Sequence, residues 1–452
     1  MANIKNCLYS GTFRMLGSST YADPIVKKNS TDNNIRVYDC YYKGDCGLTS
    51  SVATAVTTDG LASGQVAYLL NKNQSSAVWR QNIDIGEKDS EPTLDTNHHI
   101  VFYNGNKYTN YCNVHSWKNG ICVECNSIEE PQLVDDCYEI ANYGNLIWFQ
   151  QYVDAGNVNI NAKLTTNIVA NENLLDSSGN VQGTPKYNWT PIGRGYSNSS
   201  DSYNGVFDGT GYSISGLYSN GTENYCGFFG KMNKGIIKNL SIVDSYFGKS
   251  SCYYVGSFVG YGYSYSNIEN CYSNATTVGK YYCCGIAGET KGTVSNCLYN
   301  GKIKSTRNSN AIATDYKSYG KLTNCYYNEN CGLSSSRATA VTAAQLSSGE
   351  VAYLLNGDQS AINWYQNVDK GEKDNVPTLN SAHYTVFKNS NGYSNTLLGD
   401  VNDDGKVDRK DAVLILKNIS GMALDKFSTE NADYNGDGVI NSLDVIAIMK
   451  SI

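Results

Sequence analysis

The chain has 452 residues, 40% of them hydrophobic, so it is long enough to form several domains with buried cores. Its 35 Lys and Arg against 42 Asp and Glu give a net charge of −7 without a basic stripe, which argues against nucleic-acid binding. No run of about 18 apolar residues occurs, so the sequence predicts no membrane-spanning helix.

A long repeat occupies the first part of the chain. The segment CGLTSSVATAVTTDGLASGQVAYLLN begins at Cys46 and returns as CGLSSSRATAVTAAQLSSGEVAYLLN from Cys331, an offset of 285 residues. Upstream, NCLYSG at Asn6 matches NCLYNG at Asn296. The chain therefore begins partway through a module that it later presents more completely. The opening residues also lack the apolar core of a secretory signal, so we expect an N-terminally truncated fragment.

A cysteine-rich stretch, YCNVHSWKNGICVEC, follows the first copy. It places Cys112, His115, Cys122 and Cys125 as two closely spaced pairs of soft ligands. Four such ligands can surround Zn²⁺ tetrahedrally and leave no position for a substrate, so a metal here would be structural. Disulfides from Cys122 to Cys125 or Cys137 are the alternative, because secretion favours them. The odd count of 15 cysteines excludes complete pairing within the chain.

A shorter repeat lies in the middle of the chain. Asn239, Asn270, Asn296 and Asn324 stand at intervals of 31, 26 and 28 residues, among short alternating apolar runs. Such periods predict a solenoid in which each coil covers the apolar face of its neighbour. We expect a right-handed parallel β-helix or a closely related β-solenoid over residues 150–330, with the Asn side chains in a ladder at one turn.

The residues that follow these asparagines are predicted to stack inside the solenoid. They are Leu240, Cys271, Cys297 and Cys325. Free cysteine behaves as a small buried hydrophobe, and nothing nearby in the sequence lowers its pKa. We therefore interpret these thiols as core residues rather than as redox or metal-binding groups.

The glycine pattern of this region resembles a known family. The elements are GFFG at Gly227 and GIAG at Gly285, preceded by NWTPIGRG at Asn188 and FDGTGYSISGLY at Phe207. Over residues 138–330 and the N-terminal remnant they resemble the GLUG-motif repeat proteins of bacterial cell surfaces. The resemblance implies a surface-exposed β-solenoid that is often adhesive and has no common enzymatic activity.

Tyrosines offer a candidate ligand-binding strip on the solenoid. Tyr253, Tyr254, Tyr281 and Tyr282 precede successive glycine elements. On one face they could form an aromatic strip on which sugar rings stack. The alternative is that they are ordinary outward-facing strand residues of a β-rich protein.

The segment after each solenoid copy is predicted to be a cap. SGxVAYLLN has helical spacing, and the WxQN and PTL stretches that follow it alternate as strands do. We expect a helix plus hairpin over the last coil, because an uncovered β-helix end would pair with other chains. Trp79 and Trp364 in these segments could stack on sugars, but packing within the cap is the favoured interpretation.

Two acidic loops of equal length complete the chain, DVNDDGKVDRKD over 400–411 and DYNGDGVINSLD over 433–444. Each places oxygen ligands at positions 1, 3, 5, 7, 9 and 12 and a glycine at position 6, the spacing with which a single loop wraps Ca²⁺. The ligands of the first loop are Asp400, Asn402, Asp404, the backbone carbonyl of Lys406, Asp408 and Asp411; those of the second are Asp433, Asn435, Asp437, the carbonyl of Val439, Asn441 and Asp444.

A helix is predicted after each loop but not before the first. Position 12 is Asp instead of the usual Glu, and SNGYSNTLLG before the first loop leaves no room for an entering helix. The predicted apolar stripes of the two helices are Ala412, Val413, Leu416 and Ile419, and Val445, Ile448, Met449 and Ile452. This combination resembles a type I dockerin over residues 397–452.

The dockerin resemblance implies two Ca²⁺ ions, folding coupled to metal, and tight binding to a cohesin module of a scaffoldin. In the family, loop positions 10 and 11 read the cohesin, which here are Arg409 and Lys410 in the first loop and Ser442 and Leu443 in the second. The two pairs differ in charge and polarity. Interchangeable binding in two orientations is therefore not expected from them.

These elements predict a mainly β fold: a parallel β-helix or β-solenoid with helix-plus-hairpin caps and a small, all-α, Ca²⁺-binding dockerin at the C-terminus. The expected divisions are 1–46, the end of a first solenoid; 47–110, its cap; 111–130, a small zinc-ribbon-like linker; 131–331, a solenoid; 332–387, its cap; 388–396, a linker; and 397–452, the dockerin.

The functional prediction is a secreted, cellulosome-type component at the bacterial surface, whose solenoid is a non-catalytic carbohydrate-binding or adhesion module. One alternative is a β-helix polysaccharide lyase or glycoside hydrolase, and another is a structural spacer. Catalysis would need a carboxylate pair or a positioned base. The solenoid carboxylates are scattered: Asp201, Asp208, Asp244, Glu269, Glu289 and Asp315.

Overall fold

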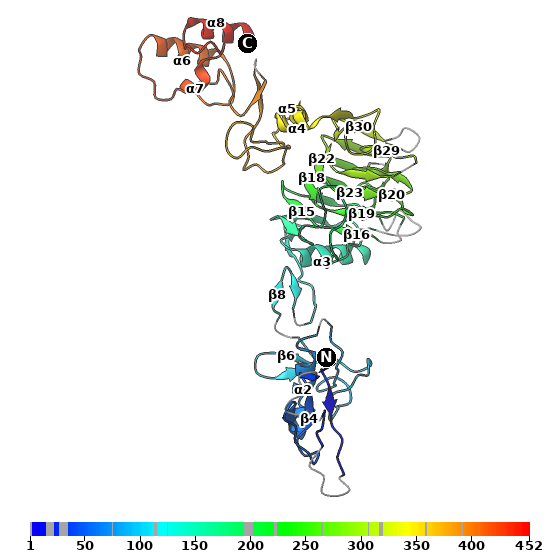
Figure 1. The fold of residues 1–452 in the computed structure, drawn as a ribbon. Helices are drawn as coiled ribbons and strands as arrows, with labels where there is room; N and C mark the ends of the chain where they lie inside the picture. The colour runs from blue at the N-terminus through cyan, green and yellow to red at the C-terminus, as the bar shows by residue number, and fades with distance from the viewer. Residues whose placement is uncertain are drawn as a thin grey trace. The chain divides into compact units, whose positions relative to one another are not determined.

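The computed structural model describes residues 2–14, 22–26, 35–74, 76–112, 115–123, 125–193, 202–220, 224–263, 265–305, 307–315, 320–357, 359–389 and 392–452. The chain divides into two compact units, Met1–Ile128 and Glu129–Ile452 (Figure 1). Within the described residues, no helix is both long and apolar enough to cross a membrane.

The first unit holds the end of a small parallel β structure and its cap. Its elements are β1 (Ala2–Lys5), β2 (Leu8–Tyr9), β3 (Ile35–Tyr38), β4 (Tyr41–Lys43), β5 (Thr54–Val56), α1 (Thr58–Ala62), α2 (Gln65–Asn71), β6 (Phe102–Tyr103), β7 (Tyr108–Thr109), β8 (Trp117–Lys118) and β9 (Ile121–Cys122). Strands β2, β4 and β5 pair in parallel, and the helices bury Leu61, Val66 and Leu70 beside them.

The second unit begins with a parallel β-solenoid, which confirms the predicted fold class (Figure 1). Its longest sheet contains β10 (Gln132–Val134), β11 (Cys137–Ile140), β12 (Asn161–Leu164), β13 (Ile168–Val169), β14 (Val206–Asp208), β15 (Ser213–Ser215), β18 (Ile236–Val243), β22 (Asn267–Ser273), β26 (Thr293–Ser295), β27 (Leu298–Tyr299), β30 (Lys321–Thr323), β31 (Tyr326–Asn328) and β32 (Thr339–Val341). Apart from the β10–β11 hairpin, its strand pairs are parallel.

Shorter sheets form the other sides of the solenoid. One contains β16 (Tyr218–Ser219), β19 (Tyr246–Gly248), β23 (Thr276–Val278) and β28 (Lys302–Lys304); another contains β17 (Phe229–Met232), β21 (Val259–Gly262), β25 (Ala287–Thr290) and β29 (Ala313–Asp315); a third contains β20 (Tyr253–Val255) and β24 (Tyr281–Cys283). Each sheet takes one strand from successive coils, as expected when a repeat covers its neighbour.

The predicted asparagine turn is present in successive coils. Asn239, Asn270, Asn296 and Asn324 all have left-handed backbone angles, with φ of 52°, 50°, 52° and 51°. Asparagine tolerates this conformation better than other non-glycine residues do. Asn324 Nδ2 donates to Asn296 Oδ1 at 2.9 Å, so the amide ladder is formed between these two coils.

The side chains after the turn point into the core, as predicted. Leu240, Cys271, Cys297 and Cys325 are all buried. Leu240 is paired with Cys271 in the register of β18 and β22. These thiols therefore fill core positions that a larger hydrophobe occupies in another coil.

The glycine elements mark places where coils approach each other closely. A Cβ atom on Gly227 would lie 2.6 Å from the carbonyl oxygen of Gly256. A Cβ on Gly256 would lie 2.6 Å from Cα of Ala287, and one on Gly285 would lie 2.6 Å from the carbonyl oxygen of Ala311. Each glycine is required because the next coil leaves no space for a side chain.

A helix that the sequence analysis did not predict covers the beginning of the solenoid. Helix α3 (Tyr143–Asp154) starts at Asn142, whose side chain accepts a hydrogen bond from the Asn145 amide. Its buried Phe149 packs edge-to-face on Phe207 of β14, with ring centroids 5.7 Å apart. The helix thereby protects the apolar core of the first coils from water.

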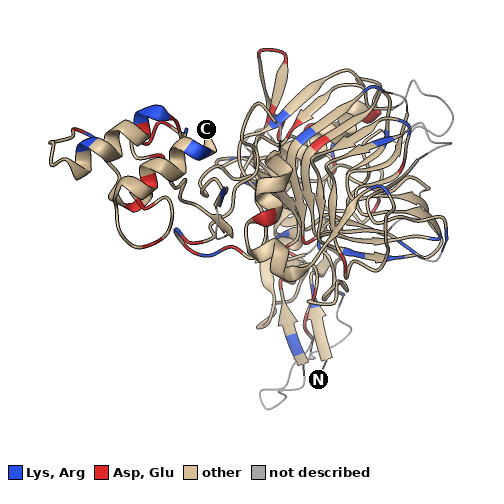
Figure 2. Cartoon of the chain, turned by 90° about the horizontal axis from the view of Figure 1, so that it is seen from above, with Lys and Arg blue, Asp and Glu red and all other residues tan. Residues whose placement is uncertain are grey.

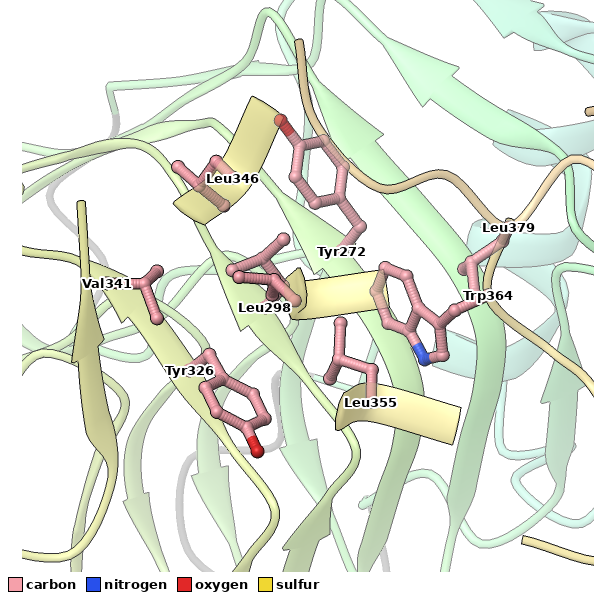
Figure 3. Close-up of a cluster of buried hydrophobic side chains, with 9 residues drawn as sticks. Tyr272, Leu298, Tyr326, Val341, Leu346, Leu355, Trp364 and Leu379 are labelled. Atoms are coloured by element: carbon pink, nitrogen blue, oxygen red, sulfur yellow. The ribbon is translucent and has the colours of Figure 1, made fainter. Parts of the chain in front are cut away.

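The cap after the solenoid contains α4 (Ala343–Ser347), α5 (Glu350–Asn356) and the hairpin of β33 (Phe387–Asn389) and β34 (Gly392–Ser394). Figure 3 shows Trp364 with Leu346 and Leu355 of these helices in one cluster with Tyr272, Leu298 and Tyr326. The last three belong to three successive paired strands: β22, β27 and β31.

The cap therefore lies along the side of the solenoid, in addition to meeting its last coil. A Cβ atom on Gly211, between β14 and β15, would lie 2.6 Å from the carbonyl oxygen of Leu379. The expectation that the segment covers only the last coil is corrected. The physical reason is that large apolar side chains point outward from several coils and require a cover.

Residues 388–396 were expected to be a linker, but they are folded onto the cap. They contain β34 and Asn395, which is buried. The Asn395 side chain accepts from the amide of Val368 at 2.7 Å and donates to the carbonyl of Gln366 at 2.7 Å. Asn110 makes the same pair of contacts with Ile83 and Gln81 in the first unit. The capping repeat thus extends to these asparagines.

The C-terminal region is helical, with α6 (Arg409–Ile419), α7 (Thr429–Ala432) and α8 (Ser442–Ser451). As predicted, no helix enters the first loop, which β34 precedes, while a single turn, α7, precedes the second. The small core consists of Val401, Ala412, Ile415, Ala432, Val445 and Ile448.

The predicted apolar stripes of α6 and α8 are partly wrong. Val413, Leu416 and Ile419 are 47%, 43% and 42% exposed, whereas Ile415 is fully buried. Met449 and Ile452 are likewise exposed. Each helix carries two apolar faces, and packing of α6 against α8 buries only one of them.

Candidate functional site

The first acidic loop is closed by hydrogen bonds from its own backbone. Oδ1 of Asp400 accepts from the Asp404 amide at 3.0 Å, and its Oδ2 accepts from the Gly405 amide at 2.8 Å. Oδ1 of Asp411 accepts from the Val401 amide at 3.0 Å. The carboxylates at positions 1 and 12 are thus held at the two ends of one compact loop.

The second loop repeats this arrangement. Oδ1 of Asp433 accepts from the Asp437 amide at 3.1 Å, and its Oδ2 accepts from the Gly438 amide at 2.8 Å. Oδ1 of Asp444 accepts from the Asn435 amide at 3.1 Å. Equivalent positions therefore have equivalent bonds, and two loops of different sequence adopt the same local structure.

Each loop is joined directly to the helix that follows it. Asp408 caps α6, and Asp411 at the third helical position bonds back to the Asp408 amide at 2.8 Å. Asn441 and Asp444 form the same capping box at the start of α8. Because the carboxylate at position 12 belongs to this box, folding of the helix places that predicted ligand.

The donor set fits a hard divalent cation. Asp411 and Asp444 are fully buried, and burial with Asp400 nearby raises the pKa of the Asp411 carboxyl. Buried carboxylates are costly unless a cation or hydrogen bonds compensate them. Gly405 and Gly438 have φ of 83° and 84°, which supplies the sharp turn that such a loop needs. Ca²⁺ would be held by the twelve predicted positions, and it would neutralise these charges.

The predicted partner-reading residues lie at the starts of α6 and α8. Arg409 and Lys410 begin α6, and Ser442 and Leu443 begin α8. Figure 2 shows basic and acidic residues together on the helices of this region. Exposed apolar side chains continue each helix at equivalent positions: Val413, Leu416 and Ile419 on α6, and Ile446, Met449 and Ile452 on α8. We call these two sets the α6 face and the α8 face.

The four predicted zinc ligands come together in the first unit. The ligand atoms of Cys112, His115, Cys122 and Cys125 all lie within 4.8 Å of one another. The Sγ atoms of Cys112 and Cys122 are 3.9 Å apart, a contact far longer than a disulfide bond. Burial and the neighbouring thiols of Cys125 and Cys122 raise the pKa of Cys112 to about 12.

The tyrosines proposed for sugar stacking stack on one another. The rings of Tyr253 and Tyr281 are parallel to within 18° at 5.2 Å, and those of Tyr254 and Tyr282 to within 4° at 4.9 Å. Tyr225 covers the other face of Tyr254 at 5.2 Å. The expectation of open ring faces is therefore corrected, because neighbouring coils already use the shared faces.

The two capping tryptophans are packing residues. Trp364 is fully buried in the cluster of Figure 3. Trp79 packs against the equivalent cluster of the first unit and donates Nε1–H to the carbonyl of Asn6 at 3.1 Å. These contacts support the packing interpretation over sugar stacking.

Several solenoid carboxylates have structural partners. Asp244 accepts from the amides of Leu174 and Leu175 at 2.7 and 2.8 Å. Asp208 lies 3.3 Å from Nζ of Lys238, and Glu289 is buried. Asp201 and the side chain of Asp315 lie outside the described residues. These contacts assign Asp244 and Asp208 to the scaffold.

Sequence reasoning missed the α6 and α8 faces and the buried asparagines of the caps. Asn110 and Asn395 are separated by the same 285 residues as the long repeat, so that repeat could have revealed them. The helix faces had no such signal, since both apolar stripes of α6 are compatible with burial.

Comparisons with known proteins agree with the C-terminal geometry and the solenoid. Residues 398–452 match the model of the dockerin type I domain, and residues 251–279 match the GLUG motif. No curated protein matches the chain. Among solved structures, a proposed immunoglobulin A1 protease from Bacteroides ovatus is similar, with 17% identity, a TM-score of 0.37, and coverage of 54% of this chain and 93% of that one.

Proposed function

We propose that this chain, which ends in a type I dockerin domain and carries a GLUG motif in a β-solenoid, is a secreted component of a cellulosome-type assembly. It would attach to a cohesin module of a scaffoldin and present its solenoid there. Calcium binding follows from the dockerin, and the paired loops are its site.

The observation that carries this proposal is the shared wiring of the two loops. In both, position 1 accepts from positions 5 and 6, and position 12 closes the loop. A bound Ca²⁺ would fix the entry to α6 and α8 together, because Asp411 and Asp444 belong to the helix caps. Cohesin binding is thereby coupled to calcium through the helix geometry.

The α6 face is the preferred docking surface in this proposal. A pocket of about 470 Å³ lies there, lined by Asn402, Arg409, Lys410, Val413, Leu414 and Lys417. Three of these residues are basic, so this face suits a partner surface with apolar residues and carboxylates. The α8 face begins with the neutral Ser442 and Leu443 and would suit a more apolar partner.

The solenoid is proposed to be a non-catalytic binding or adhesion module that the dockerin carries. Support comes from its GLUG motif and from the structural partners of Asp208 and Asp244. Stacked tyrosine faces argue against a flat sugar platform at Tyr254. Adhesion through the edges of the coils is therefore favoured over stacking on sugar rings.

The test is a calorimetric Ca²⁺ titration of the full chain after chelation, followed by cohesin binding with and without Ca²⁺. Two bound ions per chain and binding that disappears in EGTA would support the proposal. A chain that binds a cohesin equally well in EGTA, or takes up no Ca²⁺, would overturn it. The unrelated net charge of −7 is controlled by repeating the titration with Mg²⁺ at equal ionic strength.

A further inference from the structure

We propose that Cys112, His115, Cys122 and Cys125 bind one structural Zn²⁺ ion in the first unit. This site is separate from the calcium loops and from docking. It is carried by the arrangement of the four ligand atoms, which converge on one point instead of forming two pairs.

The distances fit tetrahedral zinc. Zn–S bonds of about 2.3 Å and Zn–N bonds of about 2.0 Å place tetrahedral ligand atoms roughly 3.5–3.8 Å apart. Nδ1 of His115 lies 3.6 Å from Sγ of Cys112 and 3.4 Å from Sγ of Cys125. Sγ of Cys112 and Sγ of Cys122 are 3.9 Å apart. One ion at the centre would contact all four atoms with small adjustments.

The local backbone arranges these ligands before any ion is bound. Strands β8 and β9 form a hairpin whose turn, Asn119 and Gly120, has left-handed φ of 51° and 72°. After the hairpin, the Asn126 amide donates to the carbonyl of Cys122 at 2.9 Å, which turns the chain so that Cys125 faces back. The second ligand pair is therefore positioned by backbone bonds.

His115 is also oriented by packing. Its ring stacks on Trp117 of β8, with centroids 4.7 Å apart and planes within 25°. This contact holds the imidazole so that Nδ1 points to the thiols of Cys112 and Cys125. A disulfide would leave the histidine without a role, whereas zinc uses its nitrogen.

The ligand types select the metal. Three thiolates and one imidazole suit Zn²⁺ and exclude the hard cations that the carboxylate loops prefer. Four protein ligands fill the coordination shell, so no position remains for water or substrate and the site is structural.

The segment also needs such a support. Strands β8 and β9 have two residues each, and Trp117 and Val123 are exposed. A hairpin with so little buried apolar surface is marginal in water, and a metal supplies the missing stability in small units of this kind. Zinc would hold the chain between the first cap and the start of the solenoid in one folded conformation.

The experiment measures metal content of the full chain by mass spectrometry, with Ca²⁺ kept in the buffer. We expect about one Zn²⁺ per chain, and at least a roughly tenfold loss in Cys125→Ser and His115→Ala. Cys137→Ser, which changes a half-buried cysteine of β11, is the matched control and should keep the ion.

A second readout does not depend on the folding of variants. Replacement of the metal by Co²⁺ in the unmodified chain should give the visible absorption and thiolate charge transfer of a tetrahedral S₃N site. An unmodified chain that takes up neither Zn²⁺ nor Co²⁺ under reducing conditions would overturn the proposal, as would a mass that shows disulfides among these cysteines. Loss of zinc in Cys137→Ser would equally contradict the ligand assignment.

Discussion

The phenol rings of Tyr254 and Tyr282 stack face to face, 4.9 Å apart and within 4° of parallel. Neighbouring strands in a sheet are about 4.8 Å apart, so a side chain repeated in each coil meets its own copy at the distance that aromatic stacking requires. Tyr254 adopts a left-handed φ of 57° and Tyr282 one of 50°. The ladder is therefore part of what holds these coils together, and it offsets the strain of that backbone conformation.

Replacement of Tyr254 tests this role. Tyr254→Ala removes stacking on both Tyr225 and Tyr282, so we expect the solenoid to lose about 1–3 kcal/mol of stability. Tyr265→Ala, at a side chain that is 77% exposed, is the control and should change little. Denaturant unfolding gives both values. Unchanged stability in Tyr254→Ala together with loss of binding to a glycan would restore the sugar-stacking interpretation.

The features predicted from sequence are those that repetition makes visible. Asn296 and Asn324 could be found because their period is that of the coils, and the acidic loops because ligand spacing within a loop is local. Helix α3 and the path of the cap depend on contacts between distant residues, such as Phe149 with Phe207. Local pattern does not encode which of several apolar surfaces will meet.

Helix α6 shows the same limit within four residues. Ile415 and Leu416 are adjacent and equally apolar, yet Ile415 is fully buried and Leu416 is 43% exposed. Both stripes fit an amphipathic helix, and only α8 on one side decides between them. The face left open is then available to a partner, which is why a fold error in the sequence prediction coincides with the proposed docking surface.

This pair of residues gives the second prediction. Ile415→Ala should destabilise the dockerin domain by about 2–5 kcal/mol through an unfilled core. Leu416→Ala should leave thermal stability within about 0.5 kcal/mol but weaken cohesin binding by roughly tenfold or more. Thermal unfolding and surface binding in Ca²⁺ check the two effects. Full cohesin affinity in Leu416→Ala and in the equivalent Met449→Ala would exclude both helix faces as the docking surface.

The third prediction concerns the loops one at a time. Asp411→Ala and Asp444→Ala should each leave one Ca²⁺ per chain, because each removes the buried carboxylate that closes a loop and caps a helix. Asp403→Asn is the matched control: it lies in the first loop at a non-ligand position, and asparagine keeps its left-handed φ of 53°. Calorimetric stoichiometry is the measurement, and two ions in Asp444→Ala would refute its role.

The fourth prediction uses the buried thiols. Burial raises the pKa of Cys283 to about 12 and also raises that of Cys284, so both stay protonated as the pH rises through 8. At that pH about one thiol in 10,000 would be a thiolate even without shielding. Reaction of the native chain with a disulfide reagent should therefore spare them while half-exposed Cys7 reacts. Peptide mapping that finds Cys283 modified at the rate of Cys7 would contradict the buried core.

The last prediction concerns Asn395, which organises the second cap. Its Oδ1 accepts from the amides of Val368 and Asp369 at 2.7 and 3.2 Å, and its Nδ2 donates to the carbonyls of Gln366 and Thr385 at 2.7 and 3.0 Å. Asn395→Ala would leave these backbone groups unpaired in a buried site, at a cost of at least about 3 kcal/mol.

Hydrogen exchange is the suitable measurement, because a chain of several domains does not unfold in one step. Amides of residues 366–370 should exchange at least roughly a hundredfold faster in Asn395→Ala, while those of the solenoid strands keep their protection. Asn110→Ala should produce the same loss at residues 81–85, since the equivalent bonds to Ile83 and Gln81 are present there. Asn389→Ala, whose side chain bonds only one carbonyl at 3.0 Å among the described contacts, is the milder control. If Asn389→Ala and Asn395→Ala exchange alike, the buried amide is not what holds the cap together.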